Sequence, residues 1–152
     1  NSGRIAFAPE KTEYRMVDGQ DSLQVDMTAT VNGIDIIKRF TFKRDDYAVN
    51  VSYLLANGGE SAVSARFIGQ LARDNNPDPS TGPKMGMRSF LGAAYSSPDN
   101  RYEKIDFEDI QAGNFQNREV EGGWVAIIQH YFTSAWVPPQ QQDKTYHLQR
   151  FN

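Results

Sequence analysis

Metal or acid–base chemistry in this sequence would depend first on its two histidines, His130 and His147. A carboxylate from Glu121 or Asp143 could complete a two-histidine metal site, since neutral imidazole and carboxylate groups are common metal ligands. The HxH and HxxxH spacings that bring two histidines to one face of a strand or helix are missing. We therefore interpret His130 as a packed or edge residue of a strand and His147 as a surface residue, and we predict no metal site.

Two pairs of adjacent carboxylates, Asp45-Asp46 and Glu108-Asp109, are the other candidates for acid–base work. Neighbouring side chains point to opposite faces of a strand and lie about 100° apart on a helix, so neither pair converges on one substrate atom. General acid–base catalysis also needs a neighbour that shifts a pKa towards neutrality, and none is evident here. We interpret Asp45-Asp46 as the cap of a polar turn.

Signatures of nucleophilic and phosphate chemistry are missing from the sequence as well. There is no G-x-S-x-G elbow. The glycines at residues 58–59 and 82–86 lack the strand–loop–helix setting and the following lysine of a phosphate-binding loop. Without cysteine there is no disulfide, no thiolate nucleophile and no cysteine ligand for zinc. We predict a chain that is not an enzyme and that holds no cofactor.

The charge balance argues against nucleic acid as a partner. The formal net charge is -3, and the only adjacent basic pairs are Lys38-Arg39 and Lys43-Arg44, whereas nucleic-acid-binding proteins gather Lys and Arg on one face. Hydrophobic residues make up 39% of the chain, which is enough to bury a core. No stretch approaches the roughly 18 to 20 apolar residues of a transmembrane helix.

The elements that must position these side chains show a period of two, which is typical of strands. Apolar residues alternate over residues 23–31 and again over Ile34–Lys43, and Asn32-Gly33 between them predicts a type I′ hairpin turn. Lys38 interrupts the apolar phase of the second strand, and Ile37 falls on its opposite face, which indicates a bulge or a second covered face. A polar turn at residues 43–46 leads to a third alternating strand at residues 47–55, closed by a turn at residues 57–60.

The second half of the chain is also predicted to be mostly β. We expect a strand at residues 62–71, a loop at 74–83, strands at 85–95 and 102–107 around a turn at 96–100, and a last strand at 145–151. Residues 107–110 could form one helical turn, with Asp106 as its N-cap. The apolar segment at residues 124–137 is read as two strands broken near residues 129–130. About eight strands in all favour an all-β sandwich.

Aromatic side chains crowd this second half. Most should be core, because each can bury about 150–250 Å². A few could remain exposed as docking anchors, since Tyr and Trp are favoured at interface hot spots. The candidates for contact with a partner are Tyr95, Tyr102, Phe107, Trp124, Tyr131 and Trp136.

Three runs of residues resemble one known family: FTFKRDDYAVNV at residues 40–51, GAAYSSPDNRYEK at 92–104 and, above all, GGWVAIIQHYFTSAWVP at 122–138. They are similar to segments of the first periplasmic domain of the YidC membrane insertases of Gram-negative bacteria. The likeness extends from about residue 13 to residue 138, in the same order and with similar gaps.

The resemblance implies a fold and a place in the cell. The parent protein would be an integral inner-membrane insertase, and this domain would lie in the periplasm between its first two transmembrane helices. The fold would be a β-supersandwich, a large twisted antiparallel sandwich, of which residues 1–152 would form one domain incomplete at both ends, with at most a short helical turn. The family also implies docking of the SecD–SecF accessory complex of the Sec translocon, with the contact region roughly within residues 86–137.

Two alternatives remain open. A carbohydrate-binding or mutarotase-like β-sandwich module would stack sugars on exposed, roughly coplanar aromatic rings. A weaker one is a hydrolase that uses His130 with a carboxylate.

Overall fold

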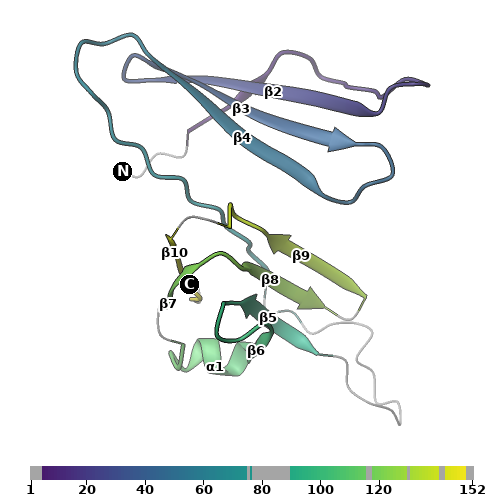
Figure 1. The fold of residues 1–152 in the computed structure, drawn as a ribbon, viewed down its shortest axis with the longest axis vertical. Coiled ribbons are helices and arrows are strands. Elements are labelled where there is room, and N and C mark those ends of the chain that lie inside the picture. The colour runs from purple at the N-terminus through teal and green to yellow at the C-terminus, as the bar shows by residue number, and fades with distance from the viewer. Residues whose placement is uncertain are drawn as a thin grey trace. The chain divides into compact units, whose positions relative to one another are not determined.

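The computed structural model describes residues 5–74, 76, 90–115, 118–129, 131–140 and 143–149, with the backbone only at residues 118, 120, 143 and 144. The fold is mostly β, with a single short helix among the described residues, which confirms the all-β prediction and is consistent with a piece of a β-sandwich (Figure 1). The chain divides into two compact units, Asn1–Arg66 and Phe67–Asn152. We call these unit 1 and unit 2. That residues 1–152 form one incomplete domain stays a prediction.

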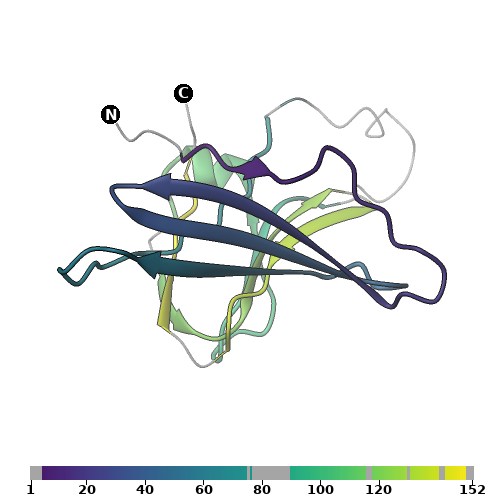
Figure 2. The ribbon, with the colours of Figure 1, turned by 90° about the horizontal axis from the view of Figure 1, so that it is seen from above.

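Unit 1 is a four-stranded antiparallel sheet in the order β1-β2-β3-β4, and Figure 2 shows β2, β3 and β4 side by side in one twisted layer. Positive φ angles of 50° at Asn32 and 77° at Gly33 confirm the predicted hairpin turn between β2 and β3. The third strand begins two residues later than predicted, and Tyr47 before it is exposed. The short β1 was not predicted. The strands are β1 (Ala8–Pro9), β2 (Ser22–Val31), β3 (Ile34–Lys43) and β4 (Val49–Asn57).

The register of β3 is continuous with both neighbours, so there is no bulge at Ile37. Ile37 lies opposite Thr28 on β2 and Leu54 on β4, on the otherwise polar face of the sheet. Of the two explanations that the sequence allowed, the bulge is wrong, and Ile37 is part of a small apolar patch on the second face.

Lys38 lies in the middle of the apolar face of unit 1. Its Nζ atom is 4.9 Å from the ring centroid of Phe40 and 5.9 Å from those of Phe7 and Tyr53. Aromatic ring faces attract a cation, which offsets part of the cost of keeping an ammonium group among apolar side chains. The interruption of the apolar pattern at Lys38 is therefore accommodated by rings on three different segments.

On the polar face, Asp26 of β2 and Arg39 of β3 form a bidentate ion pair. Arg39 donates from Nε to Oδ1 at 2.8 Å and from Nη2 to Oδ2 at 2.7 Å. These hydrogen bonds, helped by the charge of Arg39, hold the pKa of the Asp26 carboxyl below its ordinary value.

This lowered pKa predicts the direction of a pH effect. The stability that the pair contributes should be fully present above the ordinary aspartate pKa of about 3.9 and should be lost as the pH falls through the lower pKa of folded Asp26. In Arg39→Gln, an NMR titration should find the pKa of Asp26 raised. Arg44→Gln is the matched control, because the Arg44 guanidinium donates to the carbonyls of Gln20 and Val17 and to no carboxylate among the described residues. A low pKa of Asp26 in both variants would contradict this cause.

Unit 2 has a four-stranded antiparallel sheet in the order β6-β5-β8-β9 and a separate antiparallel pair of β7 and β10. The two strands expected at residues 124–137 are confirmed as β8 and β9, which pair with each other. The last strand, expected at residues 145–151, is observed as the shorter β10, which begins two residues earlier. Strand β7 was not predicted. The strands are β5 (Leu91–Ser96), β6 (Glu103–Asp106), β7 (Arg118–Glu121), β8 (Trp124–Gln129), β9 (Phe132–Trp136) and β10 (Asp143–Tyr146).

The core of unit 2 is built around Tyr95, which is 1% exposed. Its ring meets those of Phe115 and Tyr146 edge to face, with centroids 5.8 Å and 6.2 Å away. Ile105 is buried in the same cluster. Edge-to-face packing of this kind adds to the stabilisation from buried area. Fully buried residues occur only in unit 2 among the residues that the structure describes.

The predicted helical turn is helix α1 (Phe107–Gln111). Asp106 occupies the N-cap position in an extended conformation, as predicted, but its side chain makes no capping hydrogen bond. The acidic Glu108 and Asp109 lie in the first turn, where they interact favourably with the helix dipole.

The strand predicted at residues 62–71 is wrong, because that segment is irregular and forms no ladder with any described strand. Phe67 and Ile68 break the alternation that a strand needs. The segment packs instead on a ring of β9: a Cβ on Gly69 would lie 3.1 Å from Cδ2 of Trp136. Further along, Arg73 donates from Nε to Oε1 of Gln129 at 2.9 Å.

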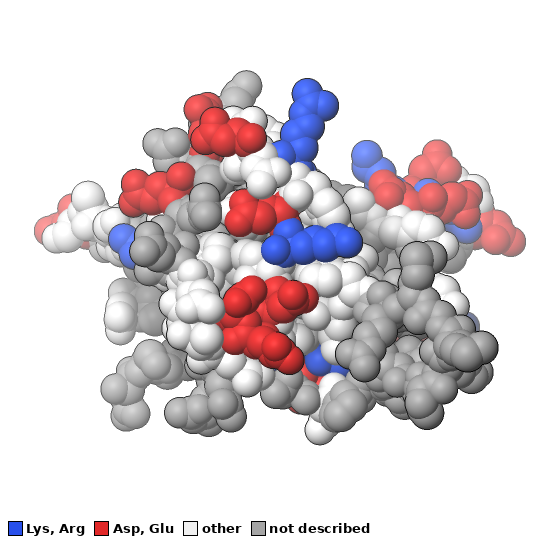
Figure 3. Space-filling view, turned by 90° about the horizontal axis from the view of Figure 1, so that it is seen from below, with Lys and Arg blue, Asp and Glu red and all other residues white. Residues whose placement is uncertain are grey.

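Charges are mixed on the surface. On the face shown in Figure 3, acidic and basic side chains are interspersed, and no continuous basic patch appears among the described residues. No helix in the described part of the chain is long and apolar enough to cross a membrane. Most of the loop expected at residues 74–83, and the start of the strand expected at 85–95, lie outside the described residues.

Candidate functional site

The most distinctive site of unit 2 is the turn between β7 and β8, formed by Gly122 and Gly123. Both have positive φ angles, 70° and 79°, which residues other than glycine rarely adopt. The backbone of Gly123 runs so close to β5 that a Cβ there would lie 2.1 Å from the carbonyl oxygen of Ser96. Glycine is thus required at position 123 for two reasons: the positive φ angle and the close approach to Ser96.

Two side chains from later in the sequence hold this turn. Oε1 of Gln140 accepts a hydrogen bond from the N–H of Gly123 at 2.8 Å, and Nε2 donates to the carbonyls of Gly123 at 3.1 Å and Pro138 at 2.8 Å. The hydroxyl of Tyr146 donates to the carbonyl of Gly122 at 3.2 Å. Burial raises the pKa of Tyr146, so the hydroxyl remains a donor over a wider pH range.

The amide of Gln140 should therefore be required as a donor. We expect Gln140→Glu to lower the free energy of unfolding by about 0.5–1.5 kcal/mol, since a carboxylate cannot donate to the two carbonyls that it would face. Urea unfolding at neutral pH followed by tryptophan fluorescence would measure this. Gln149→Glu, at an exposed position, is the control and should have little effect. Equal stability of the two variants would contradict the role of Gln140.

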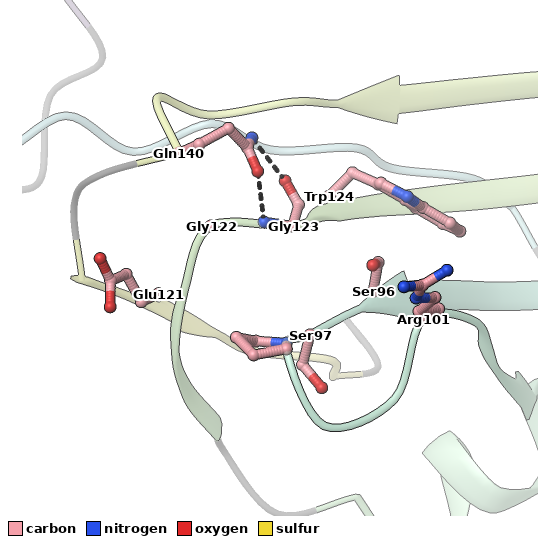
Figure 4. Close-up of a pocket in the computed structure, with 9 residues that line it drawn as sticks. Ser96, Ser97, Arg101, Glu121, Gly122, Gly123, Trp124 and Gln140 are labelled. Atoms are coloured by element: carbon pink, nitrogen blue, oxygen red, sulfur yellow. Dashed lines mark hydrogen bonds between the residues drawn. The ribbon is translucent and has the colours of Figure 1, made fainter.

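A hollow of about 430 Å³ lies beside the turn (Figure 4). Arg101 and Trp124 lie at one end of it and Glu121 at the other. No group of three or more His, Cys, Asp or Glu residues among those described could hold a metal ion. The hollow has one carboxylate, that of Glu121. Its lining comprises Ser96, Ser97, Pro98, Arg101, Glu121, Gly122, Gly123, Trp124 and Gln140.

The aromatic residues singled out from the sequence lie in different settings. Tyr95 is a core residue and is withdrawn as a contact candidate, because a side chain that is 1% exposed cannot reach a partner in this conformation. Tyr102 is 49% exposed, and its ring lies 5.8 Å from the half-buried ring of Trp124. The rings of Tyr102 and Trp124 are thus in contact with each other.

The other three are dispersed over unit 2. Phe107 is half-buried beneath the guanidinium of Arg73, which lies 5.6 Å from its centroid. Trp136 is half-buried and meets Phe67 edge to face at 6.0 Å. Tyr131, just before β9, is 85% exposed.

Sequence reasoning missed several exposed or cationic neighbours of these rings. Phe132 is 75% exposed and Val137 is 67% exposed. Lys104 lies over the rings of Phe90 and Tyr102. No sequence pattern singled out Lys104, because its neighbours depend on the register of β6 with β5.

The histidines and carboxylates form no common site among the described residues. His147 is exposed, as the surface interpretation expects, whereas His130 lies outside the described residues, and so does the side chain of Asp143. Asp46 accepts a hydrogen bond from the N–H of Ala48 at 2.9 Å, which confirms its place in the turn. Asp109 accepts one from Asn114 at 3.1 Å.

Comparison with known families decides what kind of domain this is. The profile of the YidC periplasmic domain matches residues 1–152, the whole chain. The chain belongs to the YidC periplasmic domain family. The family is non-catalytic and lies on the periplasmic side of the inner membrane, in agreement with the resemblance seen in the sequence.

Similar proteins include the membrane protein insertases YidC of Hahella chejuensis, 39% identical over 148 residues, and of Pseudomonas putida, 42% identical over 142 residues. The YidC of Saccharophagus degradans is 40% identical over 148 residues. These matches cover 96%, 93% and 97% of this chain, but 26%, 25% and 26% of the relatives. The chain therefore spans about a quarter of the length of the YidC proteins that it matches.

Proposed function

We propose that this chain is the periplasmic docking part of a YidC-type membrane protein insertase, and that its partner is the SecD–SecF accessory complex of the Sec translocon. Membership of the family supports a place on the periplasmic side of the membrane. The exposed aromatic residues of unit 2 support contact with a partner protein. Tyr131 is 85% exposed and Phe132 is 75% exposed, at the start of the sheet's edge strand β9. Exposed aromatic anchors are the side chains that most often dominate protein interfaces.

Such a docking role needs only modest affinity. A domain tethered at the membrane holds a bound partner at high effective concentration beside the rest of the insertase, so weak contacts suffice. A mixed-charge surface with scattered aromatic residues is typical of transient interfaces, whereas obligate interfaces are larger and more hydrophobic. Assistance to membrane protein insertion would then come from recruitment, without a reaction at this domain.

Site-specific photocrosslinking in the full-length insertase tests the proposal. A benzophenone side chain at Tyr102 or Tyr131 of unit 2 should give adducts with SecD or SecF in membranes that contain the complex. Tyr47 of unit 1 is a matched control, because it is a fully exposed tyrosine outside the proposed contact region. Adducts with SecD or SecF at position 47 but at neither unit 2 position would overturn the proposed contact region.

A carbohydrate-binding function is the second candidate, and the hollow beside Trp124 favours it. It places the indole of Trp124 beside polar groups of Arg101, Glu121 and Gln140, although it is open to solvent. The rings of Tyr102 and Trp124 are tilted by 43°, which is unfavourable for a flat sugar platform. Titration of oligosaccharides while following tryptophan fluorescence would test this, and an unchanged signal would count against it.

A further inference from the structure

Cationic and aromatic side chains lie next to one another on one surface of unit 2. The Nζ atom of Lys104 lies 4.9 Å from the ring centroid of Phe90 and 5.6 Å from that of Tyr102. The Tyr102 ring lies 5.8 Å from that of Trp124, and Trp124 shares the hollow with Arg101. We call this group of side chains the cation–aromatic row. It comprises Phe90, Lys104, Tyr102, Trp124 and Arg101.

Small residues of the sheet lie on the same face as the cation–aromatic row. Ala94 of β5 pairs with Lys104 of β6 on one side and with Ala126 of β8 on the other, so the three share one face. Ala94 is 0% exposed and Ala126 is 1% exposed. A Cβ at Gly92 would lie 2.6 Å from Cζ of Phe90, so glycine lets that ring lie directly on the sheet. Small residues that are covered by other side chains thus lie next to Lys104 and Trp124 on this face of the sheet.

The two cations of the row have no carboxylate partner in the described part of the chain. The ion pairs there are Arg15–Glu13 and Arg39–Asp26, both in unit 1. Both Arg101 and Lys104 are exposed. Figure 4 shows Arg101 at the Trp124 end of the hollow, away from Glu121. Both cations are thus available to anionic groups from outside.

We propose that the cation–aromatic row binds an extended acidic segment of a partner protein, with carboxylates at Arg101 and Lys104 and an apolar side chain against Trp124. This deepens the docking function proposed above and rests on it. A guanidinium pairs with a carboxylate through two parallel hydrogen bonds, and Trp and Arg are the residues most enriched at interface hot spots. The rings of Phe90 and Tyr102 hold the ammonium group of Lys104 beside them through cation–π attraction, and the exposed group can still meet a carboxylate.

Other occupants fit these residues less well. A nucleic acid would need many phosphate contacts, whereas the row offers two cations in a chain whose formal net charge is -3. A neutral glycan would use the rings but leave both cations without a counter-charge. An acidic segment with apolar residues uses the whole row.

The test uses labelled eight-residue peptides and the purified full-length insertase. The peptides alternate leucine with glutamate, glutamine or lysine, and binding is followed by fluorescence anisotropy. The glutamate peptide should bind at least about tenfold more tightly than the other two, and more weakly as salt is raised. Equal binding of the three peptides, or none by the glutamate peptide, would overturn the proposal.

Charge-reversal variants assign the binding to the row. The double variant Arg101→Glu with Lys104→Glu should weaken binding of the glutamate peptide at least about tenfold, and Lys43→Glu, on an exposed lysine of unit 1, should not. The pair Arg101→Lys with Lys104→Arg keeps both charges and should keep most of the binding, so a folding defect is distinguished from a loss of charge. Unchanged binding in the reversed variant would rule out the row.

Crosslinking separates this proposal from the docking function itself. If the charge-reversed insertase still gives SecD or SecF adducts at Tyr131 but no longer binds the glutamate peptide, the row is confirmed as an acidic-segment site that SecD–SecF docking does not need. If the wild type binds the peptide through the row but gives no SecD or SecF adduct, the identity of the partner is wrong and the row still stands.

Discussion

Replacing Gly123 by alanine should destabilise unit 2 by about 3 kcal/mol or more, through a left-handed conformation that costs about 1–2 kcal/mol and through overpacking against β5. The alanine Cβ would lie 2.1 Å from the carbonyl oxygen of Ser96, which is backbone and can move away only by breaking the sheet locally. Both tryptophans, Trp124 and Trp136, are in unit 2, so urea unfolding followed by tryptophan fluorescence reports on the affected unit.

Gly113→Ala is the matched control for this prediction. Gly113 is also in unit 2 and has a similar φ angle of 74°, but a Cβ there would meet nothing within 4 Å. Its replacement by alanine should lower the free energy of unfolding only by the cost of the positive φ angle, about 1 kcal/mol. Similar losses in the two variants would mean that the φ angle alone matters and that the close approach to Ser96 contributes nothing.

Truncating Tyr95 should have an effect of similar or larger size. Tyr95 is the one large side chain that is fully buried among the described residues, and its ring contacts Phe115 and Tyr146. Tyr95→Ala should lower the free energy of unfolding by about 3–5 kcal/mol, because the lost contacts leave a cavity that the sheet cannot fill. This is a large part of the whole stability of a typical domain, about 5–15 kcal/mol, so partial unfolding at 37 °C is expected.

The control is Tyr131→Ala, which removes an 85% exposed tyrosine from the same unit. That change should alter stability by no more than about 0.5 kcal/mol. The two variants also separate folding from docking, since Tyr131→Ala should reduce contact with a partner and leave the fold intact. A stable Tyr95→Ala variant would show that the core cluster does not hold unit 2 together.

The long strands of unit 1 could be predicted from the sequence because their information is local. Alternation of apolar and polar residues determines which face of a strand is buried, and Asn32-Gly33 supplies the two positive φ angles of the hairpin turn. Ile34–Lys43 was predicted at its observed bounds for this reason. The expected strand at residues 62–71 failed because a strand also needs a partner edge, and local composition says nothing about partners.

The candidate site could be predicted only in part. The aromatic content of unit 2 is visible in the sequence, but aromatic residues occur both in cores and at interfaces. Nothing in the local pattern separates Tyr95, which is buried, from Tyr102 and Tyr131, which are exposed. No pattern in the sequence singled out Lys104 or Arg101; the register of β5 with β6 and the lining of the hollow bring them near aromatic rings.

The sequence by itself determined that this chain is β-rich, and its Gly-Gly-Trp segment indicated the YidC periplasmic domain family that the profile comparison then established. Only the tertiary structure decided what each of these residues does. It placed Gly123 against a carbonyl of β5, closed the turn with Gln140 from seventeen residues away, and brought Lys104 between Phe90 and Tyr102. The physical reason is that backbone periodicity is a local property, whereas burial, close approach and charge pairing depend on segments that are distant in sequence and meet only in the fold.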